Sequence, residues 1–218
     1  MTGDKGLARV IQGLEAGGCK NLKELNLSQC YMRPLAGAAL AHALTSGSLL
    51  HLQKLLLNDN DFGIGDEMMV EVIVGLRGCR DHRELNLIES GMGSATAMVV
   101  YDAIRDNVWP KLRSLGLDYP DDDCLHHLAN VLLQVKGAAR WLSRFTFHRG
   151  VGRVGCEGPS FWAHALRQGA CPALTCICIS GKGVSWEYQR QMYDAVEARR
   201  HRGPLSASIS SSSGSTTT

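Results

Sequence analysis

The sequence predicts an α/β fold, a curved right-handed solenoid with a parallel inner sheet and outer helices. Three observations support this prediction. A short motif returns at a nearly fixed interval, each copy alternates apolar and polar residues as a β-strand does, and each is followed by a segment with the apolar spacing of a helix.

The repeated motif can be read in NLKELNLSQC at 21–30, HLQKLLLNDN at 51–60 and DHRELNLIES at 81–90. Aligned on its first place, it occurs six times at intervals of 30, 30, 30, 30 and 32 residues, and we call each copy a rung. The rungs begin at Leu22, Leu52, His82, Leu112, Leu142 and Leu174. Their fourth and sixth places always hold Leu, Phe or Ile, namely Leu25, Leu27, Leu55, Leu57, Leu85, Leu87, Leu115, Leu117, Phe145, Phe147, Ile177 and Ile179.

The two periodicities within each unit predict its secondary structure. Period-two alternation predicts a strand with one buried face in every rung. Apolar residues at i, i+3, i+4 and i+7 predict helices after the strands, for example over 34–44, 65–76 and 124–135. Because a helix is about 10 Å across and strands lie about 4.8 Å apart, stacked units should curve with the sheet inside.

The ends of the array should be helices. GLARVIQGLEAGG at 6–18 predicts a helix without a strand before it. SWEYQRQMYDAVEARR at 185–200 predicts a closing helix with Tyr188, Met192, Ala195 and Val196 on one face. We expect the repeat domain to span 1–202. Residues 203–218 are rich in Ser and Thr and lack periodicity, which predicts a disordered tail.

The motif LxxLxLxxN/C followed by a helix, in units of about thirty residues, resembles the leucine-rich repeat of the ribonuclease-inhibitor-like type. The resemblance covers roughly residues 7–200 and implies a horseshoe arc. It also implies that Cys30 and Asn60, at the ninth place of their rungs, bond the backbone of the turn. The ninth place departs from the pattern in the later rungs, at Ser90, Pro120, Gly150 and Lys182.

Composition argues against several classes of function. The net charge is +2, which favours neither nucleic acid nor an anionic membrane as partner. No apolar run has the length of a membrane span, and the first residues lack a signal-peptide pattern. We expect a soluble cytoplasmic protein. The basic cluster RRHR at 199–202 leaves a nuclear location open, although a cationic helix end explains it more simply.

The solvent-facing places of the strands carry the functional information. They are acidic in the early rungs, turn basic in the fifth, and include apolar side chains among the charges. Such surfaces are typical of protein interfaces, with an ordinary solvated sheet as the alternative. We therefore expect a non-catalytic module that binds an unidentified protein on its concave sheet, through Glu24, Leu56, Asn58, Asp59, Glu84, Asn86, Glu89, Asp118, Tyr119, Arg144, His148 and Arg149.

Two other interpretations stay open. Proteins with this repeat include an activator of a small GTPase, and a polar turn residue such as Asn58, Asn60, Arg149 or Arg153 could serve such a role. The chain could also be a piece of a larger receptor or regulator. No GxSxG, HExxH or phosphate-binding loop occurs, so we expect neither catalytic residues nor a cofactor.

The cysteines and histidines are mostly expected to be structural. Cys19, Cys79 and Cys171 each lie three residues before a rung and should be small core residues. His126 and His127 follow the acidic run 121–123, which is a natural helix N-terminus. Cys176 and Cys178 instead face solvent near His148, where a metal or redox role lacks a convincing fourth ligand.

Overall fold

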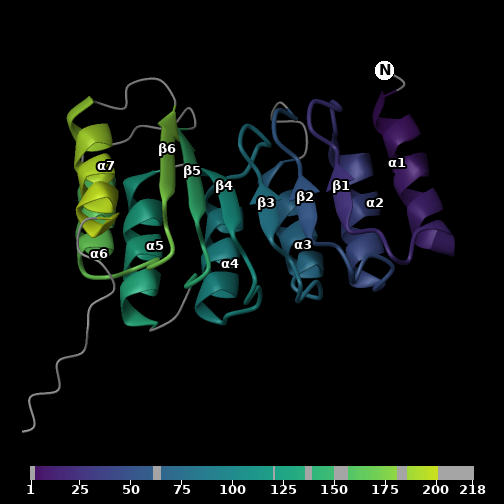
Figure 1. Ribbon diagram of the computed structural model, residues 1–218. Coiled ribbons are helices and arrows are strands. Elements are labelled where there is room, and N and C mark those ends of the chain that lie inside the picture. The colour runs from purple at the N-terminus through teal and green to yellow at the C-terminus, as the bar shows by residue number, and fades with distance from the viewer. Residues whose placement is uncertain are drawn as a thin grey trace, which may run out of the picture.

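The computed structural model describes residues 3–60, 65–119, 121–135, 139–149, 157–180 and 186–200. Six strands form one sheet in the order of the sequence, and every neighbouring pair is parallel (Figure 1). The strands are β1 (Glu24–Asn26), β2 (Lys54–Leu56), β3 (Glu84–Asn86), β4 (Ser114–Tyr119), β5 (Arg144–Arg149) and β6 (Cys176–Ser180). The predicted fold class is confirmed.

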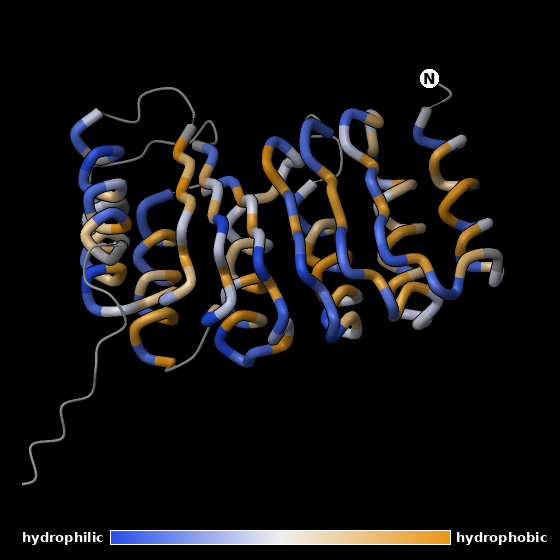
Figure 2. The backbone as a smooth tube through the Cα atoms, in the orientation of Figure 1, coloured by the Kyte–Doolittle hydropathy of each residue, from blue (hydrophilic) through white to orange (hydrophobic). Residues whose placement is uncertain are grey.

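Helices alternate with the strands and form a second layer behind the sheet in Figure 1. They are α1 (Gly3–Gly13), α2 (Pro34–Thr45), α3 (Asp66–Leu76), α4 (Ser94–Arg105), α5 (Asp122–Gln134), α6 (Glu157–Arg167) and α7 (Trp186–Arg200), with a short π-helical turn, η1 (Leu14–Gly18), after α1. Figure 2 shows hydrophobic residues recurring along these helices, and those of α2, α3, α4 and α5 include the buried residues that pack against the sheet. None of the helices in the described part of the chain is long and apolar enough to cross a bilayer.

The strands pair place for place, so equivalent residues of successive rungs form straight rows across the sheet. The row at the fourth place is Leu25, Leu55, Leu85, Leu115, Phe145 and Ile177. The interval of 32 residues before the last rung leaves this register intact, because β5 and β6 still pair at equivalent places. The two additional residues are therefore accommodated outside the paired strands.

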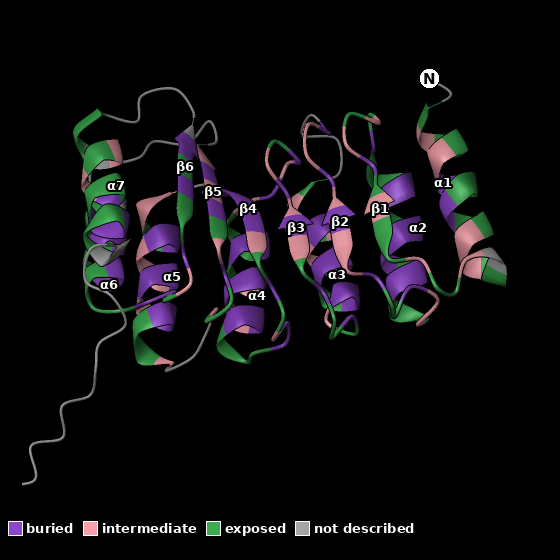
Figure 3. Cartoon of the chain, in the orientation of Figure 1, coloured by how far each residue is buried: buried purple, intermediate pink, exposed green. Residues whose placement is uncertain are grey.

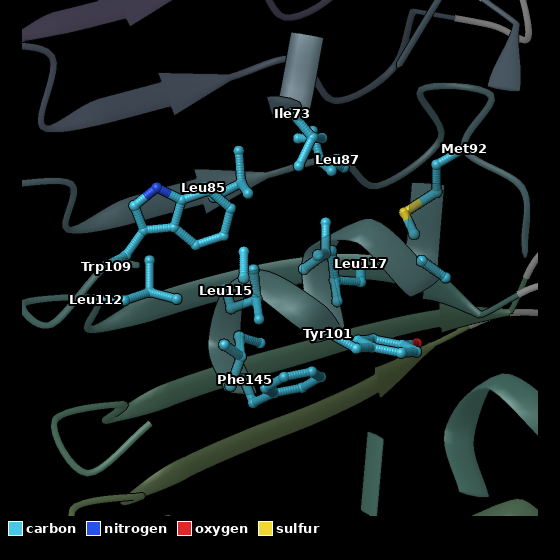
Figure 4. Packing of buried hydrophobic residues seen from close by; sticks show 14 of the residues in the cluster. Ile73, Leu85, Leu87, Met92, Tyr101, Trp109, Leu112, Leu115, Leu117 and Phe145 are labelled. Carbon is cyan, nitrogen blue, oxygen red and sulfur yellow. The ribbon is translucent and has the colours of Figure 1, made fainter. Parts of the chain in front are cut away.

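The leucine rows form the core between the two layers. Leu57, Leu87 and Leu117 are fully buried at the sixth place, and Leu27 nearly so. Figure 4 shows how Leu85, Leu87, Leu115 and Leu117 project toward Tyr101, Trp109 and Phe145 from neighbouring units. In the later rungs Phe145, Phe147 and Trp162 replace leucine packing by an aromatic cluster with ring centroids 4.0–5.0 Å apart.

The ninth-place Asn60 joins two rungs through its side chain. Its Nδ2 donates to the carbonyl oxygens of Leu27 and Leu57 at 2.8 and 2.7 Å, and its Oδ1 accepts from the backbone amides of Cys30 and Met32 at 3.2 and 3.0 Å. The role implied by the leucine-rich repeat resemblance is confirmed for Asn60.

Serine takes over part of this role in the third rung, where the sequence departs from the asparagine pattern. The buried Ser90 Oγ donates to the carbonyl oxygen of Leu87 at 2.6 Å, which is the bond equivalent to that between Asn60 and Leu57. Pro120, Gly150 and Lys182, the later ninth places, lie outside the described residues. The same is true of the expected tail at 203–218.

The helix layer has its own bonds between repeats. Asp4 of α1 accepts from the backbone amides of Arg33 and Ala36, where α2 begins, at 3.0 and 3.1 Å. Asp66 of α3 does the same for α4, accepting from Gly93 and Thr96 at 2.8 and 3.0 Å. Each carboxylate thus satisfies amide groups that a helix N-terminus leaves free, and does so across the boundary between units.

The opposite edge of the array is also bonded between units. His82, the one polar residue at a first place, is fully buried and its Nδ1 lies 3.1 Å from the carbonyl oxygen of Leu52. Trp109 Nε1 donates to the carbonyl oxygen of Leu76 at 3.2 Å. One ring nitrogen of the histidine at this leucine place thus has a backbone partner in the preceding rung, whereas Nε2 is buried without a hydrogen bond.

We predict that Leu85→Asp unfolds the array, because an unpaired carboxylate would be buried in the leucine row at a cost of several kcal/mol. Leu50→Asp is the matched control, since Leu50 is 49% exposed. Circular dichroism melts of both variants measure the difference. A Leu85→Asp protein that melts cooperatively near the wild-type temperature would contradict the assignment of the core.

We also predict that Asn60→Ala lowers the free energy of unfolding by about 3 kcal/mol, because it leaves buried backbone groups without partners. Asn26→Ala, at an exposed asparagine, should cost about 1 kcal/mol or less, since it removes one bond, from the Ser28 amide. Urea titration at 25 °C compares the two. Equal losses would argue against a special role for the ninth place.

Candidate functional site on the open face of the sheet

The candidate site is the face of the sheet turned away from the helices, which we call the open face. It is built from the third, fifth and seventh places of each rung, because these alternate with the buried fourth and sixth places. Figure 3 shows exposed and intermediate residues along β1, β2 and β3, in contrast to the buried faces of the helices. No described helix covers this face in Figure 1.

The rungs leave the sheet at different places in the two halves of the array. In the first three rungs the eighth place adopts a left-handed backbone, with φ of 56° at Gln29, 57° at Asp59 and 52° at Glu89. In the fourth and fifth rungs the strands instead continue, and Tyr119 pairs with Arg149 at that place. The early part of the open face is therefore short and ends in a turn, whereas the later part is a longer sheet.

The early part of the open face carries a network of amides. Ser28 Oγ and Asn86 Nδ2 both donate to Asn58 Oδ1, at 2.7 and 3.2 Å, so the network spans three rungs. Asn58 Nδ2 donates to Asp59 Oδ2 at 2.7 Å. One row away, Lys54 Nζ lies 3.2 Å from Glu84 Oε2 and neutralises it. The network fixes these side chains and leaves Glu24 and Asn26 as exposed groups beside it.

The centre of the open face holds a cluster of one histidine and two carboxylates, the 89/118/148 cluster. His148 Nδ1 lies 3.2 Å from Asp118 Oδ1, and its Nε2 lies 3.1 Å from Glu89 Oε1. The second oxygen of Asp118 accepts from the backbone amide of Glu89 at 2.9 Å. A protonated imidazole can donate to both carboxylates at once, so the cluster joins β4 and β5 to the turn that follows β3.

Asp118 is the most perturbed acid of the described open face. Burial raises its pKa to about 6, although the hydrogen bond from the Glu89 amide and the charge of His148 act to lower it. Its side chain is 9% exposed, whereas that of Glu89 is 50% exposed. Within this cluster, Glu89 is therefore the carboxylate that faces solvent.

Two expectations from the sequence are corrected here. Asp118 was expected to face solvent at the seventh place, but it is buried, because Glu89 and His148 bond to it from both sides. His148 was expected to contribute to a basic fifth rung, but it lies between two carboxylates and so belongs with the acidic groups. Among the basic open-face residues whose side chains are described, Arg144 is the exposed one in that rung.

The remaining expected partner-binding residues lie on the open face or its turn edge. Leu56, Asn58, Asp59, Glu84 and Asn86 are half-buried, and Glu24, Glu89 and Arg144 are exposed. The backbones of Tyr119 and Arg149 pair in the sheet, but their side chains lie outside the described part of the chain. The structure thus brings these residues to one surface.

Gly116 is a contributor to this surface that sequence reasoning did not single out. A Cβ atom at this position would lie 2.5 Å from Asn86 Oδ1 and 3.1 Å from the Ile88 side chain. Glycine therefore lets the Asn86 side chain lean across β4. The signal available in the sequence was a glycine at a fifth place, where every other rung has a side chain.

The two asparagines considered for a role toward a GTPase already use their side chains in hydrogen bonds within the protein. Asn60 is buried and its amide is used by backbone groups of two rungs. Asn58 is held by Ser28, Asn86 and Asp59. The Arg149 side chain and all of Arg153 lie outside the described residues. The interpretation therefore gains no support from the asparagines.

The prediction of core cysteines holds for Cys79 and Cys171 but not fully for Cys19, which is only partly buried. Cys79 and Cys171 are buried, Cys19 is partly buried, and Cys176 and Cys178 are exposed. Asp121 accepts from the Cys124 amide at 2.7 Å and caps α5, while His126 stacks on Phe161 with ring centroids 4.0 Å apart. Among the described residues, no group of three or more His, Cys, Asp or Glu side chains is arranged to hold a metal ion.

Comparisons with known proteins identify the fold. No family model and no curated protein matches the chain. Among solved structures, the tropomodulin C-terminal domain of Caenorhabditis elegans matches with a TM-score of 0.52 and 14% identity, over 90% of this chain and 94% of that chain. Leiomodin-1 Actin-Binding Site 2 matches with a TM-score of 0.47 and 11% identity, over 88% of each chain. The chain therefore has a leucine-rich repeat fold of the ribonuclease-inhibitor-like type, and identities this low show the fold alone.

We predict that Asp118→Asn makes the protein relatively more stable as the pH rises. The pKa of Asp118 is raised from 3.8 to about 6 by folding, so wild-type stability from this group is present below about pH 4 and is lost as the pH rises through 6. Asparagine cannot ionise. The free energy of unfolding of the variant, relative to that of the wild type, should therefore increase by about 1–3 kcal/mol between pH 4 and pH 7.5.

Urea titrations at both pH values measure this difference, with Asp194→Asn as the control at an exposed carboxylate. The control should track the wild type at both pH values. A difference between Asp118→Asn and the wild type that does not change with pH, or that changes in the opposite direction, would refute the assignment of a raised pKa.

Proposed function

We propose that this chain is a non-catalytic recognition module that binds a protein partner along the open face of its parallel sheet. The observation that carries the proposal is the uncovered face itself. Parallel sheets are normally buried on both sides, and here the described helices pack against one side only. A sheet whose second face carries polar, half-buried side chains and no helices is suited to bind another protein on that face.

The residues of the open face fit a protein better than a small molecule. The face is a broad lattice of amides and charges with the aliphatic side chains of Leu56 and Ile88 half-buried among them. Interfaces between proteins combine such apolar contacts with a polar surround. The amide network and the 89/118/148 cluster hold their side chains in place before binding, which reduces the entropy lost on association.

The size of the face also supports a macromolecular partner. Six strands about 4.8 Å apart and three to six residues long present roughly 400 Å². One side of a standard protein interface buries about 800 Å². A partner should therefore cover most of the sheet and extend onto the turn edge, where Gln29, Asp59 and Glu89 lie.

Charge would orient the partner along the face. Glu24, Asp59 and Glu89 lie toward the early rungs, and Arg144 is exposed in the fifth. A partner with a basic patch opposite the early rungs and an acidic group opposite Arg144 has the matching pattern, and complementary charge of this kind mainly raises the association rate and the specificity. Tyr119 and Arg149 remain proposed contacts, from the eighth places of β4 and β5.

We predict that a photo-crosslinking amino acid at Asn26 or Arg144 captures a discrete protein in the native cell extract, because both positions are exposed on the open face. Matched positions on the outer helices are Val74 and Met98, which are 52% and 37% exposed. These should yield no specific adduct. Mass spectrometry of the adducts identifies the partner.

The captured protein then tests the site with purified components. Glu24→Lys combined with Arg144→Glu should weaken its binding at least about tenfold, because both ends of the face would repel the groups they now attract. Glu71→Lys on α3 is the control and should bind as the wild type does. Adducts formed only from Val74 and Met98, or unchanged binding by the double variant, would place the interaction elsewhere.

A further inference from the structure

Cys176 and Cys178 form a pair of exposed thiols on β6, the last strand of the sheet. Ile177 between them is buried, so the alternation of the strand places both cysteines on the open face. Among the described residues, neither sulfur takes part in a hydrogen bond or an ion pair.

The other described cysteines are held differently. Cys79 Sγ donates to the carbonyl oxygen of Leu49 at 3.2 Å, and Cys30 Sγ donates to that of Ser28 at 3.3 Å. Burial raises the pKa of the Cys79 thiol to about 11 and that of Cys124 to about 12. Because the thiolate is the form that binds metals, these buried thiols are poor ligands. The pair on β6 is exposed, and no described hydrogen bond holds either thiol.

Strand geometry decides what two such thiols can do together. Residues two apart in a strand have Cα atoms about 6.6 Å apart, at the upper limit of about 6.8 Å that a disulfide tolerates. A direct bond between the sulfurs would therefore strain the strand. A metal ion with metal–sulfur bonds of about 2.3 Å separates its two sulfurs by up to about 4.6 Å, which suits side chains leaning toward each other from that spacing.

The surroundings favour a two-coordinate ion over zinc. Zinc requires four ligands in a structural site, and the described residues supply no group of three. The histidine of the neighbouring strand, His148, is already bound to Glu89 and Asp118. Thiolates select Cu(I), zinc and iron–sulfur clusters, and of these Cu(I) accepts a site with two sulfur ligands, whereas structural zinc and the clusters require four ligands.

A charged neighbour completes the site. Arg144 is exposed and pairs in register with Cys176, one strand spacing away. A Cu(I) ion with two thiolates carries a net charge of −1, so the positive charge of an arginine on the neighbouring strand stabilises the complex. The two thiols and the arginine thus form a small site in which the charges balance.

We propose that Cys176 and Cys178 bind one Cu(I) ion as a two-coordinate bis-thiolate site, with Arg144 as the countercharge. Two S–H bonds release their protons to solvent and two S–Cu bonds form, without electron transfer. The proposal does not depend on the protein partner proposed above. It assigns a metal-binding role to the end of the open face that the amide network does not reach.

The test is an anaerobic titration of the full 218-residue chain, fully reduced, with Cu(I) in competition with the chelator bicinchoninate. The wild type should bind one more Cu(I) ion per chain than the double variant that carries Cys176→Ser and Cys178→Ser. Each single serine variant should lose affinity by about 100-fold or more, since even loss of an outer-shell partner costs about 10–100-fold. Cys30→Ser should keep the wild-type affinity, and Arg144→Gln should weaken binding without abolishing it.

A second readout needs no variant. Bound Cu(I) should protect Cys176 and Cys178 of the wild-type chain from alkylation by iodoacetamide, while the labelling of Cys30 stays unchanged, as peptide mass spectrometry can measure. Single serine variants that bind as tightly as the wild type would show two independent thiols and overturn the proposal. Equal alkylation with and without Cu(I) would overturn it as well.

Discussion

The hydrogen bonding of each repeat to the next is the interaction on which the rest of this structure depends. The described side-chain hydrogen bonds between repeats join residues 27 to 33 positions apart, whether they lie in the turns, as at Asn60, in the helix layer, as at Asp66, or at the opposite edge, as at Trp109. Paired residues of neighbouring strands from β1 to β5 are likewise 30 positions apart. A unit cut out of the array would expose leucines and unpaired backbone groups on both sides, so its stability resides largely in its neighbours.

This constraint also determines what the open face can carry. Because the fourth and sixth places must fill the core, the third, fifth and seventh places are the ones free to vary, and polar groups on them meet partners one rung away. The contact from Ser28 to Asn58 and that from His148 to Asp118 both span thirty residues. Side chains that bond along a row are held in place, and a rigid display of this kind is the physical basis of recognition by a solenoid.

The fold could be predicted from the sequence because its signal is periodic, and six rungs in phase determine strands, helices and buried rows together. The candidate site was only partly predictable. Each of its residues could be assigned to a face, but the burial of Asp118 depends on β4 continuing to Tyr119 and on Glu89 and His148 closing over the carboxylate. Position in a rung says which way a side chain points. It does not say which charges will meet there, and so a histidine that looked basic belongs to an acidic cluster.

The two ends of the open face differ in chemistry, and this difference links the two proposals. The early rungs present amides and carboxylates, whereas the last strands present Arg144 beside two thiols. A Cu(I) bis-thiolate would offset the positive charge of Arg144, the group proposed to attract an acidic part of the partner. Metal and partner would then compete for one guanidinium. Thermodynamic linkage requires that each lower the affinity of the other by the same factor. Measuring this factor in the Arg144→Gln variant would separate two explanations. If the competition is for the charge of Arg144, the factor should fall to about 1 in the variant, whereas it should stay unchanged if the metal simply obstructs the partner.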